Sequence, residues 1–96
     1  MTLSSSLVSQ LSALARQYGA ERLVLYGSRA RGDCSERSDI DLAVFGMPRE
    51  RHAAFSAAVE ELPTLLHFDL AFIRTDTKQA FLTNIEKDGI TLYEKD

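Results

Sequence analysis

A tight turn and two carboxylates at a fixed distance constrain this chain more than any other feature. The sequence runs Gly27-Ser28, then ten residues, then Asp39-Ile40-Asp41, and the second part lies inside an apolar run. Such a run between turn residues predicts a buried strand. Because alternate residues of a strand share a face, we expect Asp39 and Asp41 to point the same way while Ile40 points into the core.

Two neighbouring carboxylates repel each other and contribute nothing to folding. They are useful when a divalent cation lies between them. Hard cations such as Mg²⁺ prefer oxygen ligands and keep coordination positions for phosphate oxygens. The pair Asp39 and Asp41 therefore predicts metal-dependent phosphate chemistry.

The Gly-Ser turn supplies the complementary phosphate contacts. Gly27 allows a sharp turn that presents backbone N–H groups, and the Ser28 hydroxyl can donate to a phosphate oxygen. We expect a short helix to begin over residues 30–33, and its first amides would add positive potential at the same place.

Arginines follow the turn directly. Arg29 and Arg31 can supply positive charge to the β- and γ-phosphates of a nucleotide. Either of them could instead form a surface ion pair with Asp33 or Glu36, and such pairs contribute little to stability. Arg37 is interpreted as a solvated loop residue.

A third carboxylate should complete the metal site, and Asp69 is the best candidate. It interrupts an apolar strand, and the segment Asp69-Leu70-Ala71 repeats the pattern Asp41-Leu42-Ala43. If the two strands are neighbours in matching register, the three carboxylates converge at one end of the sheet. The alternative is an exposed aspartate on an edge strand.

Other polar residues fit structural roles better. Asp76 and Asp88 occupy positions where a helix cap and a helix end are expected. His52 and His67 lack a partner at metal-ligand spacing, so zinc is not expected. Cys34 is the only cysteine, so the chain cannot form an internal disulfide, which suits the reducing cytoplasm.

Composition sets wider limits. With 96 residues and 45% hydrophobic residues, we expect one compact domain over residues 1–96. The net charge of −3 argues against a general nucleic-acid surface. No apolar run reaches the roughly 20 residues that a membrane span needs, and the first residues lack the basic region of a secretion signal.

Helical and strand patterns alternate along the chain. Leucines at helical spacing and turn residues such as Gly19 and Pro63 mark the boundaries. The expected helices cover residues 3–18, 48–62 and 75–88, with the last one capped by Thr75 or Asp76, and the expected strands cover residues 22–26, 39–45, 65–73 and 90–93. This order predicts an α/β (α+β) domain with a small mixed sheet flanked by helices.

The motif Gly27-Ser28-x10-Asp39-Ile40-Asp41, with Ser38 before it and Asp69 on a later strand, resembles the polymerase-β-like nucleotidyltransferase superfamily. Within it the chain is similar to the minimal nucleotidyltransferases, the MNT-type antitoxins of HEPN/MNT toxin–antitoxin pairs. The resemblance covers nearly the whole chain.

That resemblance implies two Mg²⁺ ions held by Asp39, Asp41 and Asp69, with ATP held at the turn and Arg29. It also implies a protein partner, a HEPN ribonuclease toxin that is modified with AMP on a tyrosine and thereby silenced. The Leu-rich first helix could offer this partner an apolar patch, or could simply pack into the core.

A second reading is a binding module that neutralises the toxin without catalysis. The intact Gly-Ser turn and the three acids favour the enzyme. Nucleotidyl transfer to a small molecule such as an aminoglycoside is a weaker option, because no second domain is evident.

Overall fold

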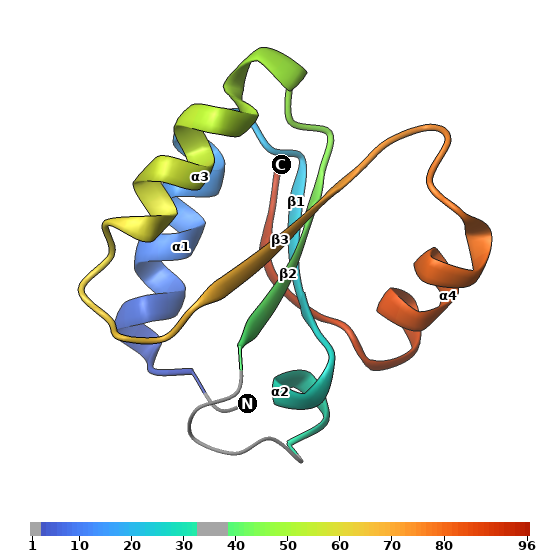
Figure 1. The fold of residues 1–96 in the computed structure, drawn as a ribbon, viewed down its shortest axis with the longest axis horizontal. Helices are drawn as coiled ribbons and strands as arrows, with labels where there is room; N and C mark the ends of the chain where they lie inside the picture. Colours follow the sequence, from blue (N-terminus) through green and yellow to red (C-terminus); the bar gives the residue numbers. More distant parts are fainter. Residues whose placement is uncertain (1–2, 33–38) are drawn as a thin grey trace.

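The computed structural model of the chain describes residues 3–32 and 39–96 (Figure 1). The described elements are α1 (Ser5–Gln17), β1 (Arg22–Tyr26), α2 (Ser28–Arg31), β2 (Ile40–Phe45), the 3₁₀ turn η1 (Arg49–Arg51), α3 (His52–Glu60), β3 (Phe68–Ile73), α4 (Gln79–Asp88) and β4 (Ile90–Glu94). The predictions made for Asp33, Cys34, Glu36, Arg37 and Ser38 lie outside the described residues.

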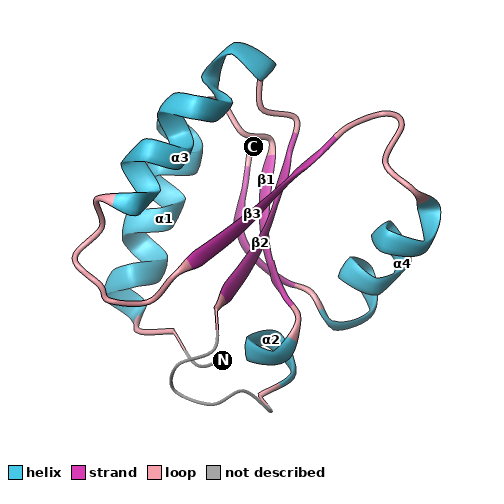
Figure 2. Cartoon of the chain, viewed as in Figure 1, coloured by secondary structure: helices cyan, strands magenta, loops and turns pink. Residues whose placement is uncertain are grey.

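The four described strands form one mixed sheet in the order β3-β2-β1-β4. Strand β1 runs antiparallel to β2 and β4, whereas β2 and β3 run parallel. Figure 2 shows helices on both sides of this sheet. The predicted α+β architecture, a small mixed sheet flanked by helices, is therefore confirmed.

Helices α1 and α3 cover one face of the sheet and lie side by side (Figure 1). Leu7 and Leu11 of α1 and Phe55 of α3 are buried in the main core cluster. Alternate residues of β2, including Ile40, point into this cluster, as the sequence predicted. Leu7 and Leu11 thus serve core packing rather than an exposed patch.

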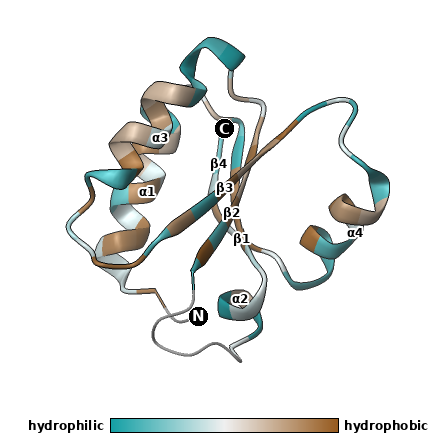
Figure 3. Ribbon diagram, in the orientation of Figure 1, coloured by the Kyte–Doolittle hydropathy of each residue, from teal (hydrophilic) through white to brown (hydrophobic). Residues whose placement is uncertain are grey.

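Helix α4 lies on the opposite side of the sheet. Its Ile85 is fully buried against Val24 and Ala43 of the two central strands. Figure 3 shows apolar residues on the two central strands and on α1 and α3, with hydrophilic residues mainly in the loops and turns around them. In the described part of the chain, no helix is long and apolar enough to cross a membrane.

Helix starts differ from the sequence prediction. The expected helix over 48–62 is a 3₁₀ turn followed by the shorter α3. The expected cap at Thr75 or Asp76 is wrong, because α4 begins at Gln79 after Lys78. Residues 74–77 instead form a turn of their own, in which the Arg74 backbone N–H donates to the Thr77 hydroxyl at 2.8 Å.

The third strand is also shorter than predicted. Strand β3 begins at Phe68, and Leu65 is 99% exposed. A local turn precedes the strand. In it the Thr64 hydroxyl accepts a hydrogen bond from the Leu66 N–H at 3.2 Å. Apolar residues alone could not show where pairing with β2 starts.

Candidate active site at one end of the sheet

Two of the three predicted carboxylates lie directly beside each other. Asp41 of β2 is the register partner of Asp69 of β3, so the two strands are neighbours in the matching register that the choice of Asp69 required. Register partners in neighbouring strands share a face. Asp39 is the residue immediately before β2 and is exposed.

Tyr26 extends this row on the other side. It is the register partner of Asp41 in the antiparallel pair of β1 and β2. Its ring packs edge-on against Phe81 of α4, with 5.7 Å between the ring centroids. The row of Tyr26, Asp41 and Asp69 therefore lies on the face of the sheet that α4 partly covers.

The electrostatics show that the carboxylates act on one another. Partial burial raises the pKa of Asp41 above its ordinary value, and the charges of Asp69 and Asp39 raise it further, while Arg31 lowers it. Burial also raises the pKa of Tyr26, and Asp41 and Asp69 add to that shift. The end of the sheet is therefore an anionic region suited to a cation.

Gly27 brings the turn against one of these carboxylates. Its φ is 77°, and a Cβ at this position would lie 2.5 Å from Oδ2 of Asp41. Only glycine combines this backbone conformation with such a close approach. The turn and the carboxylate are thus one structural unit.

The short helix begins earlier than predicted. Helix α2 starts at Ser28, directly after the Gly27 cap, instead of at residue 30. Its hydrogen bonds run from the Arg31 N–H to the Gly27 carbonyl at 3.1 Å and from the Gly32 N–H to the Ser28 carbonyl at 2.9 Å. The half-buried Ser28 therefore lies at the start of the helix.

The two arginines of α2 differ in their surroundings. Arg29 is only 4% exposed and makes interactions within the protein. Arg31 is exposed, and its Nη1 lies 3.8 Å from Oδ2 of Asp88 on α4. Since Arg31 also lowers the pKa of Asp41, it supplies positive charge near the carboxylates.

The donor set suits a hard cation, since Asp39, Asp41 and Asp69 offer carboxylate oxygens of the type that Mg²⁺ prefers. Among the described residues, however, no three His, Cys, Asp or Glu side chains are grouped as a preformed metal site. The carboxylates share one end of the sheet but do not yet converge on a single point.

Other predicted residues lie apart from this row. His67 is exposed just before β3, and its carbonyl accepts a hydrogen bond from the Ile40 N–H at 2.8 Å. Asp76 lies beyond the far end of β3 and pairs with Arg74. Sequence reasoning did not place Tyr26 beside Asp41, although its position directly before Gly27 at the end of an apolar run was a usable signal.

Comparison with known proteins identifies the family. The model of the family "Polymerase beta, Nucleotidyltransferase" matches residues 9–96. The chain belongs to this family. A search of curated proteins gave no match.

Solved structures show the same fold. The chain is similar to a crystal structure of a toxin–antitoxin with AMP-PNP, with 18% identity and a TM-score of 0.68, over 93% of this chain and 74% of the other. It is also similar to a mutant of the toxin–antitoxin MntA-HpeT, with 16% identity and a TM-score of 0.67, over the same shares of the two chains, 93% and 74%. At these identities the likeness establishes the fold alone.

Proposed function

We propose that this nucleotidyltransferase-family chain is an MNT-type antitoxin that transfers AMP from ATP to a tyrosine hydroxyl of a partner HEPN ribonuclease toxin and thereby neutralises it. The observation that carries the proposal is the matching register of Asp41 and Asp69 beside the Gly27 turn. Family membership supports the reaction class, and fold neighbours taken from toxin–antitoxin complexes support a protein acceptor.

In this proposal the three carboxylates hold the metal. Asp39, Asp41 and Asp69 would bind two Mg²⁺ ions, which when bound neutralise the triphosphate and lower the pKa of the attacking hydroxyl. Three carboxylates that repel one another in the free protein gain most from such neutralisation, because burial and like charge already raise the pKa of Asp41.

The turn and α2 would hold the triphosphate. Gly27 lies against the Asp41 carboxylate, and Ser28 begins α2 directly after it, so both residues lie at the end of the sheet that holds the carboxylates. Arg31 would approach the phosphates from the exposed side of the helix. Arg29 would act from its buried position by fixing α2 and adding positive potential.

The transfer step then balances as a substitution at the α-phosphorus. The tyrosine oxygen forms a bond to that phosphorus, and the bond to the bridging oxygen of pyrophosphate breaks. Asp69 is exposed and would accept the phenolic proton. Pyrophosphate leaves with the electron pair of the broken bond.

Neutralisation by binding alone is the second candidate. One observation favours it: within residues 3–32 and 39–96, no three side chains of the metal-binding types are grouped together. In that case the fold would present a surface to the toxin and the carboxylates would have no catalytic role.

Labelled ATP separates these candidates. The purified chain and toxin are incubated with Mg²⁺ and ATP labelled at either the α- or the γ-phosphorus. Label on the toxin from the α position only, with the wild type but not with Asp41→Asn, is the expected result. Toxin that is inhibited yet carries no label under any condition would refute the transfer reaction.

A further inference from the structure

The two edges of the sheet are protected very differently. At the β4 edge, the register against β1 shifts between Leu23 and Val24. The Ser12 hydroxyl of α1 donates to the Leu92 carbonyl of β4 at 2.9 Å. Irregular pairing and coverage of this kind prevent another strand from adding to an edge.

Strand β3 forms the other edge, and its pairing shows no such register shift. Its six residues pair with β2 in unbroken parallel register. Asp69 is its only charged residue, and it contains no proline. A regular, mostly apolar edge strand is one that pairs readily with another chain.

The hydrogen-bond pattern shows which groups face outward. The Ile40 N–H donates to the His67 carbonyl, and Ile40 is the register partner of Phe68. In a parallel pair a residue bonds the two neighbours of its register partner, so the partner's own N–H and C=O point away. Phe68, Leu70 and Phe72 therefore present their backbone groups at the open edge.

Side chains at both ends of β3 add to this surface. Leu65, three residues before the strand, is 99% exposed. At the other end a pocket of about 630 Å³ includes Phe72 among its lining residues. The ring of Phe72 stacks on His52 of α3, with 3.9 Å between the centroids.

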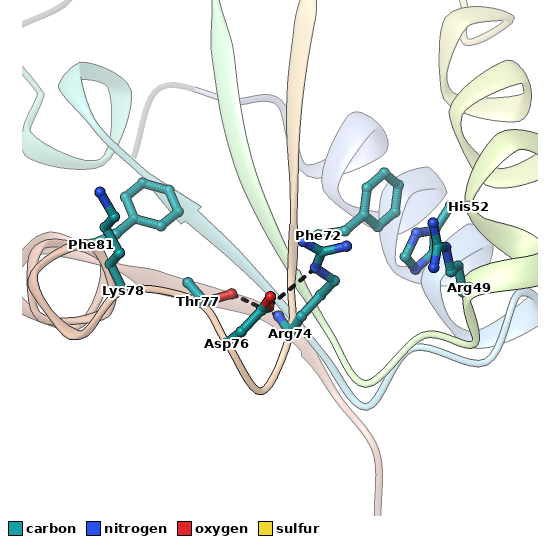
Figure 4. Close-up of a pocket in the computed structure, with 8 residues that line it drawn as sticks. All are labelled: Arg49, His52, Phe72, Arg74, Asp76, Thr77, Lys78 and Phe81. Carbon is teal, nitrogen blue, oxygen red and sulfur yellow. Dashed lines mark hydrogen bonds and ion pairs between the residues drawn. The ribbon is translucent and has the colours of Figure 1, made fainter.

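That pocket is strongly cationic. Its charged lining residues are Arg49, Arg74 and Lys78 against the single carboxylate of Asp76. Figure 4 shows Arg49 on one side of the end of β3, Lys78 on the other and Arg74 between them. Within the described residues, Arg49 and Lys78 form no ion pair, and Arg74 pairs with Asp76 at 3.3 Å.

A local excess of positive charge stands out in a chain whose net charge is −3. We propose that an extended acidic segment of the partner protein adds to β3 as a fifth strand and places its carboxylates against Arg49, Arg74 and Lys78. The backbone of β3 supplies the pairing, and the cations select an acidic segment. This inference rests on the proposed function only in taking the toxin as the partner.

Amide hydrogen exchange followed by NMR tests the pairing residue by residue. In the free chain we expect the amides of Leu70 and Phe72 to exchange fast and those of Ala71 and Ile73, which face β2, to exchange slowly. In the complex with the toxin, Leu70 and Phe72 should become slow as well. Unchanged exchange of these two amides in the complex would overturn the proposal.

Charge reversal tests the acidic character of the segment. The double variant Arg49→Glu, Lys78→Glu should weaken toxin binding by about tenfold or more. The matched control Arg16→Glu, Lys95→Glu makes the same charge change at exposed sites beside β4 and should leave the affinity within about threefold. Equal effects of the two variants would refute charge selection at the pocket.

Two further outcomes are informative. Slow exchange of Leu70 and Phe72 in the free chain, appearing as its concentration rises, would show that a second copy occupies the edge and would overturn the proposal. Transfer of AMP is measured on the same complex. Protection without transfer contradicts the proposed reaction alone, whereas transfer without protection contradicts the strand pairing alone.

Discussion

Replacing Gly27 by alanine should damage stability and activity together, because one residue shapes both the turn and the Asp41 carboxylate. The backbone there has φ 77° and ψ −155°, a region used almost solely by glycine, and a side chain in it costs about 1–3 kcal/mol. The added Cβ would also lie 2.5 Å from Oδ2 of Asp41, so the carboxylate must move.

Gly32, at the other end of α2, is the matched control. Its φ of 82° is also unfavourable for alanine, but a Cβ there has no neighbour within 4 Å. Gly32→Ala should therefore cost only about 1 kcal/mol for the backbone. In a domain of this size each kcal/mol lowers Tm by roughly 4–8 °C.

Thermal unfolding and AMP transfer measured on both variants test this reasoning. We expect Gly27→Ala to lower Tm by about 10 °C or more and Gly32→Ala by about 5 °C. Displacing the Asp41 carboxylate, which we propose holds the metal, should reduce transfer by about 100-fold in Gly27→Ala only. Equal losses of Tm and of activity in the two variants would refute the role of the Gly27–Asp41 contact.

Three further outcomes follow from the structure. Asp41→Asn should raise Tm at pH 7, because folding raises the pKa of Asp41 and the charged carboxylate therefore destabilises the folded state. This destabilisation develops as the pH rises from 3.8, the ordinary pKa of the group, through the raised pKa of the folded state. In melts at a series of pH values the gain should therefore vanish below pH 3.8, and a gain that persists there would contradict the linkage. Phe55→Ala should destabilise the chain by about 3–5 kcal/mol in urea unfolding, since Phe55 is fully buried, and a loss below about 1 kcal/mol would show that α3 is not part of the core. Leu65→Ser should leave Tm unchanged within about 2 °C, because Leu65 is 99% exposed, yet should weaken toxin binding in calorimetry; a large fall in Tm would mean that Leu65 packs against the fold.

The sequence carried much of the site because the features that define it are local. The repeated sequence Asp-Leu-Ala at 41–43 and 69–71 pointed to Asp69 as the partner of Asp41, and the register that places them side by side is the one the structure shows. Alternating burial favours one register between two strands. The Gly27-Ser28 turn and the Asp39-Ile40-Asp41 run could likewise be recognised, because each is defined by neighbouring residues in the sequence.

Features that depend on tertiary contacts could not be predicted in this way. Arg29 and Arg31 are equivalent in sequence, and only the packing of α2 buries one and exposes the other. Leu65 lies in an apolar run, but pairing with β2 begins only at Phe68. The difference between the protected β4 edge and the open β3 edge emerges only when the strand order is known.

Intact mass spectrometry of the toxin, co-purified with the chain from cells, tests the central claim most directly. The wild-type chain is compared with the double variant Asp39→Asn, Asp41→Asn. We predict toxin whose mass is raised by whole AMP units with the wild type and unchanged with the variant. Toxin that is bound equally by both and never modified would contradict the account.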